Sequence, residues 1–114
     1  MPNVHQFLKG FNIHKKLILD DFQLIDINIT HEPIIRYREY KYEINLHFRY
    51  LGNKITNLEN LIQALKSYTE GERIIYTSYG NPYKCTFGNP EVVQWDSENV
   101  IIKSLGHATR IFLK

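Results

Sequence analysis

The sequence predicts an α+β domain in which one amphipathic helix packs across a curved, mostly antiparallel sheet. Three observations predict it: a long run that alternates apolar and polar residues, one segment with helical periodicity, and several strand-sized runs separated by turn residues. The same order of elements also suits a small, partly closed barrel. No low-complexity linker divides the 114 residues, so we expect a single domain, 1–114.

The N-terminal residues 1–16 have a helix-like apolar spacing, formed by Val4, Phe7, Leu8 and Phe11. Gly10 weakens this pattern, because glycine is a poor helix former. We therefore expect a short helix or an irregular arm in this segment.

Two extended segments follow the N-terminal one. In residues 22–30, FQLIDINIT alternates Ile25, Ile27 and Ile29 with polar residues, which is typical of a half-buried strand, and the segment 31–33 predicts a break. The run IIRYREYKYEINLHFRYL, 34–51, is the strongest strand prediction in the chain. Its even positions from residue 40 should face the core: Tyr40, Tyr42, Ile44, Leu46, Phe48 and Tyr50.

The segment after this strand changes its period from 2 to 3.6. One stripe collects Leu58, Leu61, Ile62, Leu65 and Tyr68. Thr56 and Glu59 stand at capping-box spacing, and Gly71 provides a C-terminal stop. The sequence therefore predicts an amphipathic helix at about 57–69.

From Arg73 onward, four or five short strands are predicted as an antiparallel meander. The turns should lie at 80–82 and 88–90, which are both Gly-Asn-Pro, at 96–99, and at Gly106, between IIKSL and ATRIF. Cys85 alternates with Tyr83 and Phe87 on one side of a strand, so we expect a buried small hydrophobe rather than a reactive thiol.

Composition narrows the class of protein. With 43% hydrophobic and 23% charged residues the chain is an ordinary globular one, and a net charge of +2 is too small to indicate a nucleic-acid partner by itself. The single cysteine excludes an internal disulfide framework, and no signal peptide or apolar run of about 20 residues occurs. We expect a soluble, cytoplasmic protein.

No sequence motif indicates catalysis, a metal or a cofactor. The five histidines are scattered, and no glycine-rich phosphate cradle is present, so we expect neither metal nor cofactor. Glu43 and His47 share one side of a strand, as a metal-independent nuclease would require, but four residues span about 13 Å. His47 and Arg49, about 6.6 Å apart, could share one anion, but the catalytic carboxylate would have to come from another strand. We therefore favour a protein without enzymatic activity.

The odd positions of the long strand allow a nucleic-acid hypothesis. Lys41, His47 and Arg49 lie on this side, and cations interspersed with aromatic rings are typical of surfaces that bind single-stranded RNA or DNA. The alternative is a solvated sheet face, because the rings fall on the opposite side. Only at 36–38, Arg-Tyr-Arg, do cations and a ring come together before the alternation begins.

A protein interface is the hypothesis we favour over nucleic acid. The chain has eight tyrosines, and Tyr76, Tyr79 and Tyr83 lie around a Gly-Asn-Pro turn, where exposed tyrosines often anchor interfaces. The stretch SLGHATRI, 104–111, predicts either a hairpin turn or an anion-binding turn.

We predict a small binding module that acts through a protein–protein interface, as an adaptor, an inhibitor or a self-assembling homo-oligomer, with single-stranded nucleic-acid binding as the alternative. The candidate binding residues are Arg36, Tyr37, Arg38, Lys41, His47, Arg49, Tyr79, Tyr83, His107 and Arg110.

Overall fold

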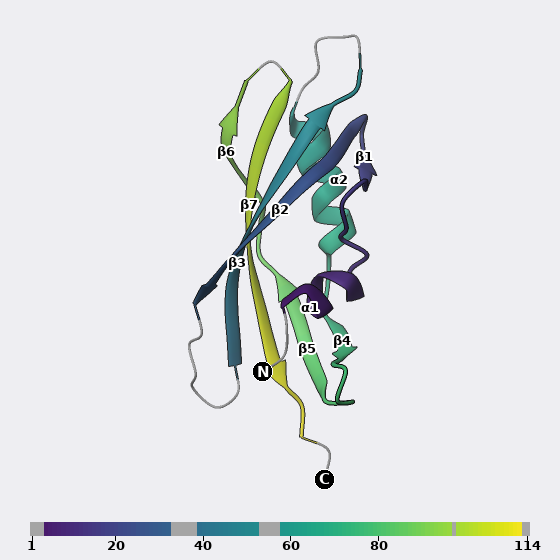
Figure 1. The fold of residues 1–114 in the computed structure, drawn as a ribbon, viewed down its shortest axis with the longest axis vertical. Coiled ribbons are helices and arrows are strands. Elements are labelled where there is room, and N and C mark those ends of the chain that lie inside the picture. The colour runs from purple at the N-terminus through teal and green to yellow at the C-terminus, as the bar shows by residue number, and fades with distance from the viewer. Residues whose placement is uncertain (1–3, 33–38, 53–57, 97, 113–114) are drawn as a thin grey trace.

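The fold is an α+β domain with a strongly curled antiparallel sheet, as the sequence predicts (Figure 1). The computed structural model describes residues 4–32, 39–52, 58–96 and 98–112. The elements in chain order are α1 (Val4–Gly10), β1 (Ile18–Leu19), β2 (Phe22–Glu32), β3 (Glu39–Tyr50), α2 (Leu58–Thr69), β4 (Arg73–Tyr76), β5 (Pro82–Phe87), β6 (Glu91–Trp95) and β7 (Asn99–Arg110).

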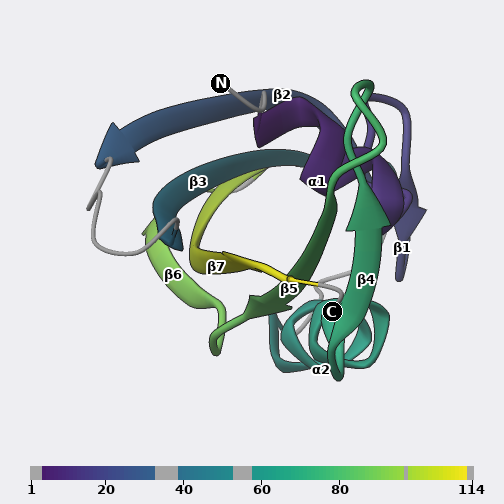
Figure 2. The same cartoon turned by 90° about the horizontal axis from the view of Figure 1, so that it is seen from below.

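The sheet has the strand order β1-β2-β3-β7-β5-β4, and every pairing in it is antiparallel. Strand β6 lies off this path and pairs with β7 alone. Viewed along the curl, the strands form half a barrel, with both helices on its concave side (Figure 2). The curl makes a one-sided core, because only the concave side is covered by helices.

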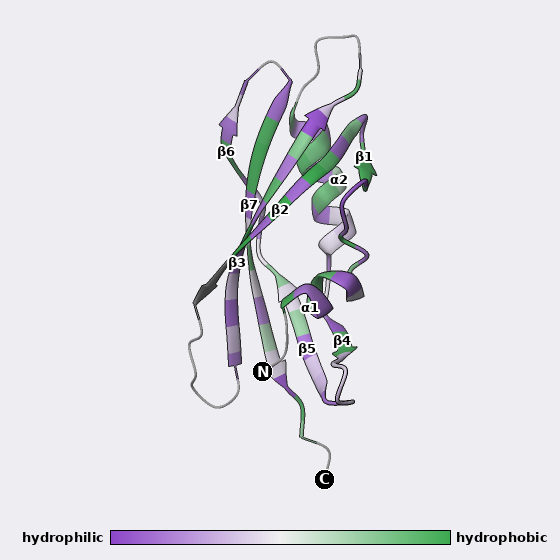
Figure 3. Cartoon of the chain, viewed as in Figure 1, coloured by the Kyte–Doolittle hydropathy of each residue, from purple (hydrophilic) through white to green (hydrophobic). Residues whose placement is uncertain are grey.

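The alternation along β3 is confirmed. Tyr42, Ile44, Leu46 and Phe48 are buried in the core, while the odd positions between them are exposed or half-buried. Hydrophilic and hydrophobic residues form alternating bands along β2 and β3 (Figure 3). The even-numbered side chains of β3 thus pack in the core, and the odd-numbered ones face outward.

A β-bulge changes the side-chain pattern of β2. Its register to β3 shifts between Leu24 and Asp26, so one additional residue separates the two halves of the strand. Leu24 is buried before the bulge, and Ile27 and Ile29 pack against the core after it. The prediction that Ile25 shares their side is wrong, because the bulge leaves Ile25 exposed.

Both predicted helices are present. In α1, Phe7 and Leu8 are fully buried, and in α2 Leu61 and Leu65 are. Helix α2 ends two residues before Gly71, whose φ of +80° is the left-handed conformation that glycine adopts readily at helix ends. The predicted capping residue Thr56 lies outside the described residues.

The predicted turn at Gly106 is wrong, whereas the other three turns are found between β4, β5, β6 and β7. Gly106 lies inside the continuous strand β7, directly opposite Tyr42 of β3. A Cβ atom built on Gly106 would lie 2.1 Å from the Tyr42 ring. Glycine is needed here because the tyrosine ring occupies the side-chain space, and not because the chain turns.

Candidate functional site

Three of the predicted binding residues on β3 lie on one surface, the outer face. We define the outer face as the odd positions of β3 and their cross-strand partners on β7. Lys41, His47 and Arg49 lie on it, and His107 of β7 lies directly opposite Lys41. The predicted segment 36–38, Arg36, Tyr37 and Arg38, lies outside the described residues.

The charges of the outer face are interleaved. Lys103 Nζ lies 3.8 Å from Glu43 Oε1 and 3.6 Å from Glu91 Oε2, and His107 Nε2 lies 3.7 Å from Glu39 Oε2. Carboxylates between the cations reduce the positive potential that would attract phosphates. Single-stranded nucleic-acid binding on this face stays a prediction, and the ion pairs give it no additional support.

His47 is hydrogen-bonded to the side-chain amide of Asn99. Its Nε2 lies 3.0 Å from Asn99 Oδ1, a geometry in which the imidazole N–H donates to the amide oxygen. Among the described residues, no carboxylate lies within ion-pair distance of His47, and Glu43 is paired with Lys103 instead. Glu43 and His47 are therefore not paired, and the described carboxylate that interacts with His47 is Asp96, whose pKa is lowered first by backbone hydrogen bonds and then by the proximity of His47.

The turn just before Asn99, the partner of His47, contains a stabilised carboxylate. Asp96 Oδ1 accepts hydrogen bonds from the backbone N–H groups of Glu98, at 3.1 Å, and Asn99, at 3.0 Å. These bonds, that of Glu98 first, hold the pKa of Asp96 below its usual value. The arrangement closes the turn between β6 and β7.

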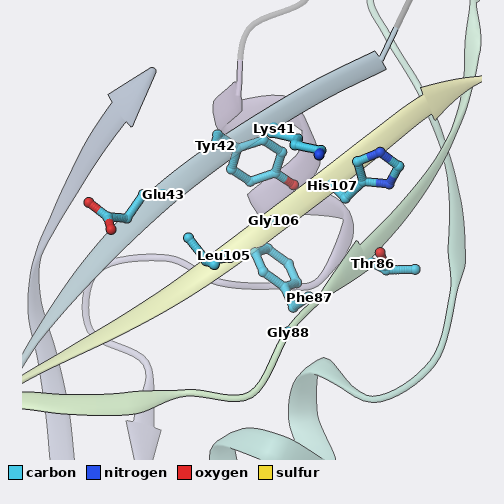
Figure 4. Close-up of a pocket in the computed structure, with 9 residues that line it drawn as sticks. All are labelled: Lys41, Tyr42, Glu43, Thr86, Phe87, Gly88, Leu105, Gly106 and His107. Carbon is cyan, nitrogen blue, oxygen red and sulfur yellow. The ribbon is translucent and has the colours of Figure 1, made fainter. Parts of the chain in front are cut away.

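The outer face is hollowed where β3, β7 and β5 lie side by side (Figure 4). The cavity has a volume of about 540 Å³. Its lining includes the side chains of Lys41, Glu43, Thr86, Leu105 and His107. The structure therefore brings Lys41 and His107, which the sequence suggested separately, to one concave site.

The tyrosines around the first Gly-Asn-Pro turn have different environments. Tyr79 is 84% exposed at the tip of the β4–β5 hairpin. Tyr83 is only 4% exposed, and its ring packs 5.4 Å from that of Phe7 and 5.7 Å from that of Tyr40. The prediction of Tyr83 as an exposed anchor is wrong, because it lies on the core-facing side of β5.

The anion-binding turn proposed around Gly106 is not formed. His107 and Arg110 are three positions apart in a continuous strand, so their side chains leave from opposite faces of the sheet. Arg110 Nη2 donates to Asn81 Oδ1 at 2.9 Å, which ties the end of β7 to the β4–β5 turn. We assign Arg110 a structural role and exclude it from the site.

Two titratable groups are buried in the core near one another. Burial raises the pKa of Cys85 to about 12, in agreement with the prediction of an inert, packed thiol. Burial, and then the proximity of Cys85, raise the pKa of Tyr42. The Tyr42 hydroxyl is buried and has no hydrogen-bond partner among the described residues.

The sequence did not indicate the most exposed apolar strand of the fold. All five residues of β6 are exposed, and Val92 is 42%, Val93 55% and Trp95 54% accessible. The available signal was the pair Val92-Val93: adjacent apolar residues in a strand cannot both face one side. We call residues 91–95, with the backbone edge that faces away from β7, the β6 edge.

The two ends of the main sheet are better protected. On β2, the bulge and the exposed Asp26, which lies 3.7 Å from Lys15 Nζ, interrupt the edge. On β4, Arg73 Nη1 donates to Gly10 O at 3.2 Å, and Ile75 packs against Gly10 in α1. The terminal strands β1 and β4 also carry exposed apolar side chains, Ile18, Ile74 and Tyr76, but β6 is the described strand in which every side chain is exposed.

Comparison with known proteins gives no relative: no protein-family model, curated protein or solved structure matches this chain. Within the described ranges, no helix is long and apolar enough to cross a membrane. The same part of the chain has no group of three or more His, Cys, Asp or Glu side chains arranged to hold a metal ion.

Proposed function

We propose that the chain is a protein-binding module that adds an extended, apolar segment of a partner protein to the β6 edge. The observation that carries this proposal is the exposure of all five β6 residues, three of them large and apolar. An unpaired strand edge offers a row of backbone donors and acceptors, and pockets between its alternate side chains supply specificity.

The chemistry of the β6 edge favours an uncharged partner strand. Glu91 is its only charged residue, and Lys103 already pairs with that carboxylate at 3.6 Å. The edge has neither lysine nor proline within it, the residues that usually prevent edge-to-edge pairing, and its one irregularity is a shift of the register to β7 between Val92 and Gln94. Trp95 is a suitable anchor, because tryptophan is enriched among the residues that dominate interface energies.

The proposal is tested with linear peptides selected from a random display library on the immobilised protein. The synthetic peptides are then titrated by calorimetry into the wild type, Val93→Lys and Val93→Thr. We expect Val93→Lys to lower the affinity at least about tenfold, because a charge on the edge opposes strand addition. The matched variant Val93→Thr keeps the β-branched shape and should stay within about threefold.

Trp95 is the only tryptophan of the chain, so its emission reports binding at the β6 edge directly. Peptide addition should shift this emission to shorter wavelength. Peptides that bind without changing Trp95 emission, and that lose affinity in Tyr79→Ala but not in Val93→Lys, would place the interface on the β4–β5 hairpin and overturn the proposal.

Self-association and nucleic-acid binding are further outcomes of the same set of measurements. Sedimentation velocity over a range of protein concentrations shows whether a second copy occupies the β6 edge. Fluorescence anisotropy with single-stranded RNA and DNA at low and physiological salt tests the outer face. Binding that weakens steeply with salt and is lost in Arg49→Glu would move the function to nucleic acid.

A further inference from the structure

We infer that the cavity on the outer face is a binding site for a small organic oxyanion, a carboxylate or a phosphate monoester with a short apolar body. This inference is independent of the β6 edge, since the cavity is lined by residues of β3, β5 and β7 and by the residue that follows β5, Gly88. It rests on the positions of the polar side chains and on the volume of the cavity.

Three polar side chains form a row across three strands. Lys41 of β3 lies directly opposite His107 of β7, and His107 lies directly opposite Thr86 of β5. Neighbouring strands are about 4.8 Å apart, so the row extends over about 10 Å. Figure 4 shows Lys41 and His107 close together on one side of the cavity. Ammonium, imidazole and hydroxyl groups are donors for a carboxylate or phosphate.

Two of the carboxylates near the row lie within ion-pair distance of another side chain, and a third acidic residue, Glu32 of β2, lies opposite Lys41 in the β2–β3 register. Glu39 pairs with His107 at 3.7 Å, and Glu43 pairs with Lys103 at 3.8 Å and is directed away from Lys41 (Figure 4). Lys41 is exposed and makes no ion pair with any described residue. Lys41 and His107 thus place two donors on one side of the cavity, and a carboxylate or phosphate can accept from both.

The Glu39 pair also fixes the histidine ring. Because His107 Nε2 faces the carboxylate, Nδ1 is the ring nitrogen that remains for a ligand. Thr86 makes no hydrogen bond with a described residue through its hydroxyl, so it can donate to the same ligand from the other side.

Gly88 adds no side chain to the cavity where the chain leaves β5 for β6, and its N–H donates to Leu105 O at 2.8 Å. The volume of about 540 Å³ lies within the usual range for small-molecule sites, about 300–1,000 Å³. Leu105 is 58% exposed and provides an apolar wall, so the ligand class includes an aryl or branched alkyl group.

Amide chemical shifts of the full chain test the inference, with benzoate, phenyl phosphate and neutral benzyl alcohol as probes. We expect saturable shifts at residues 41–43, 86–88 and 105–107 with at least one of the two anions, and none with benzyl alcohol. The stronger of the two anions identifies the oxyanion. Loss of the charge in Lys41→Gln should weaken binding at least about fivefold.

Lys84→Gln is the matched control, because Lys84 is an exposed lysine of the same sheet that pairs with Glu72 at 3.6 Å and does not line the cavity. Thr86→Val removes the hydroxyl while keeping the side-chain shape, and should also weaken binding. The inference is overturned by any of three results: no saturable shift up to about 50 mM of either anion, equal shifts with benzyl alcohol, or equal losses in Lys41→Gln and Lys84→Gln.

Discussion

Strands β5 and β6 pair with the same edge of β7, yet one is sealed into the core and the other is exposed. β5 pairs with residues 106–110 of β7, and its Tyr83 and Cys85 are buried. β6 pairs with residues 100–103, and all five of its side chains are exposed. The difference shows that pairing within a sheet does not by itself bury the side chains of a strand; they are buried only where another layer covers the strand.

Helix α1 is that layer for β5. Phe7 of α1 lies against Tyr83 of β5 and stacks on Tyr42 of β3, at ring separations of 5.4 and 5.9 Å. Figure 2 shows α1 inside the curl of the sheet, while β6 lies away from both helices. The β5 side of this edge thus contributes to stability, and the exposure of the β6 side supports our proposal that binding occurs there.

We expect the largest loss of stability from a substitution in α1, the layer that covers β5. Phe7→Ala deletes a fully buried ring and should lower the free energy of unfolding by about 4 kcal/mol, through lost burial and a cavity. Trp95→Ala, on the exposed strand, should cost less than about 1 kcal/mol. Denaturant unfolding measures both. Similar losses in the two variants would mean that the two sides of the edge do not differ.

The next effect concerns the close contact between β3 and β7. Gly106→Ala places a Cβ atom against the Tyr42 ring and should destabilise the fold by about 3 kcal/mol. Gly88→Ala is the matched control, because its Cβ would meet only Leu105 O, at an ordinary 3.7 Å. Thermal unfolding that shifts equally in both variants would contradict the packing of Tyr42 over Gly106.

A smaller change in stability, and a favourable one, is expected from a substitution at Tyr42. Tyr42→Phe removes a buried hydroxyl that has no described partner and should raise the free energy of unfolding by about 1 kcal/mol. Tyr68→Phe should instead be neutral or slightly destabilising, because the Tyr68 hydroxyl donates to Asn12 O at 3.1 Å. A loss of stability in Tyr42→Phe, measured by denaturant unfolding, would show that the hydroxyl is satisfied.

The smallest expected effect is a pH dependence of stability that comes from Asp96, in the turn between β6 and β7. The backbone N–H groups of Glu98 and Asn99 lower the pKa of Asp96, so the carboxylate stabilises the fold above the usual aspartate pKa of about 4. This contribution is lost as the pH falls through the lowered pKa. Asp96→Asn should therefore be less stable than wild type at pH 7, and the difference should shrink at pH 2.5. A constant difference between the two pH values would contradict this linkage.

The sequence was sufficient for elements whose signal is local. The even face of β3 and the stripe of α2 follow from side-chain periodicity alone, and both are confirmed. Gly106 was taken for a turn because its real constraint, the ring of Tyr42, comes from a strand distant in the sequence. The bulge at Ile25 could not be predicted from the sequence for the same reason, because only the register of β2 to β3 defines it.

The candidate sites were predictable only in part. Lys41 and His107 were both candidates, but their meeting in one cavity depends on the β3–β7 register. Tyr83 was taken for an exposed anchor because a turn adjacent in sequence does not reveal which side of β5 the ring occupies. The β6 edge was missed: the pair Val92-Val93 indicated only that one apolar side chain faces outward, while the exposure of the whole strand depends on where α1 and α2 lie.

Residue-resolved hydrogen exchange tests whether β6 binds a peptide and β5 does not, by comparing the amides of both strands with and without a peptide selected on the wild type. We predict that β5 amides exchange slowly in both samples, while β6 amides include fast ones that become protected at least about tenfold when the peptide binds. Equal protection of β5 and β6 in the free protein, or no change at β6 on peptide binding, would contradict the assignment of binding to the β6 edge.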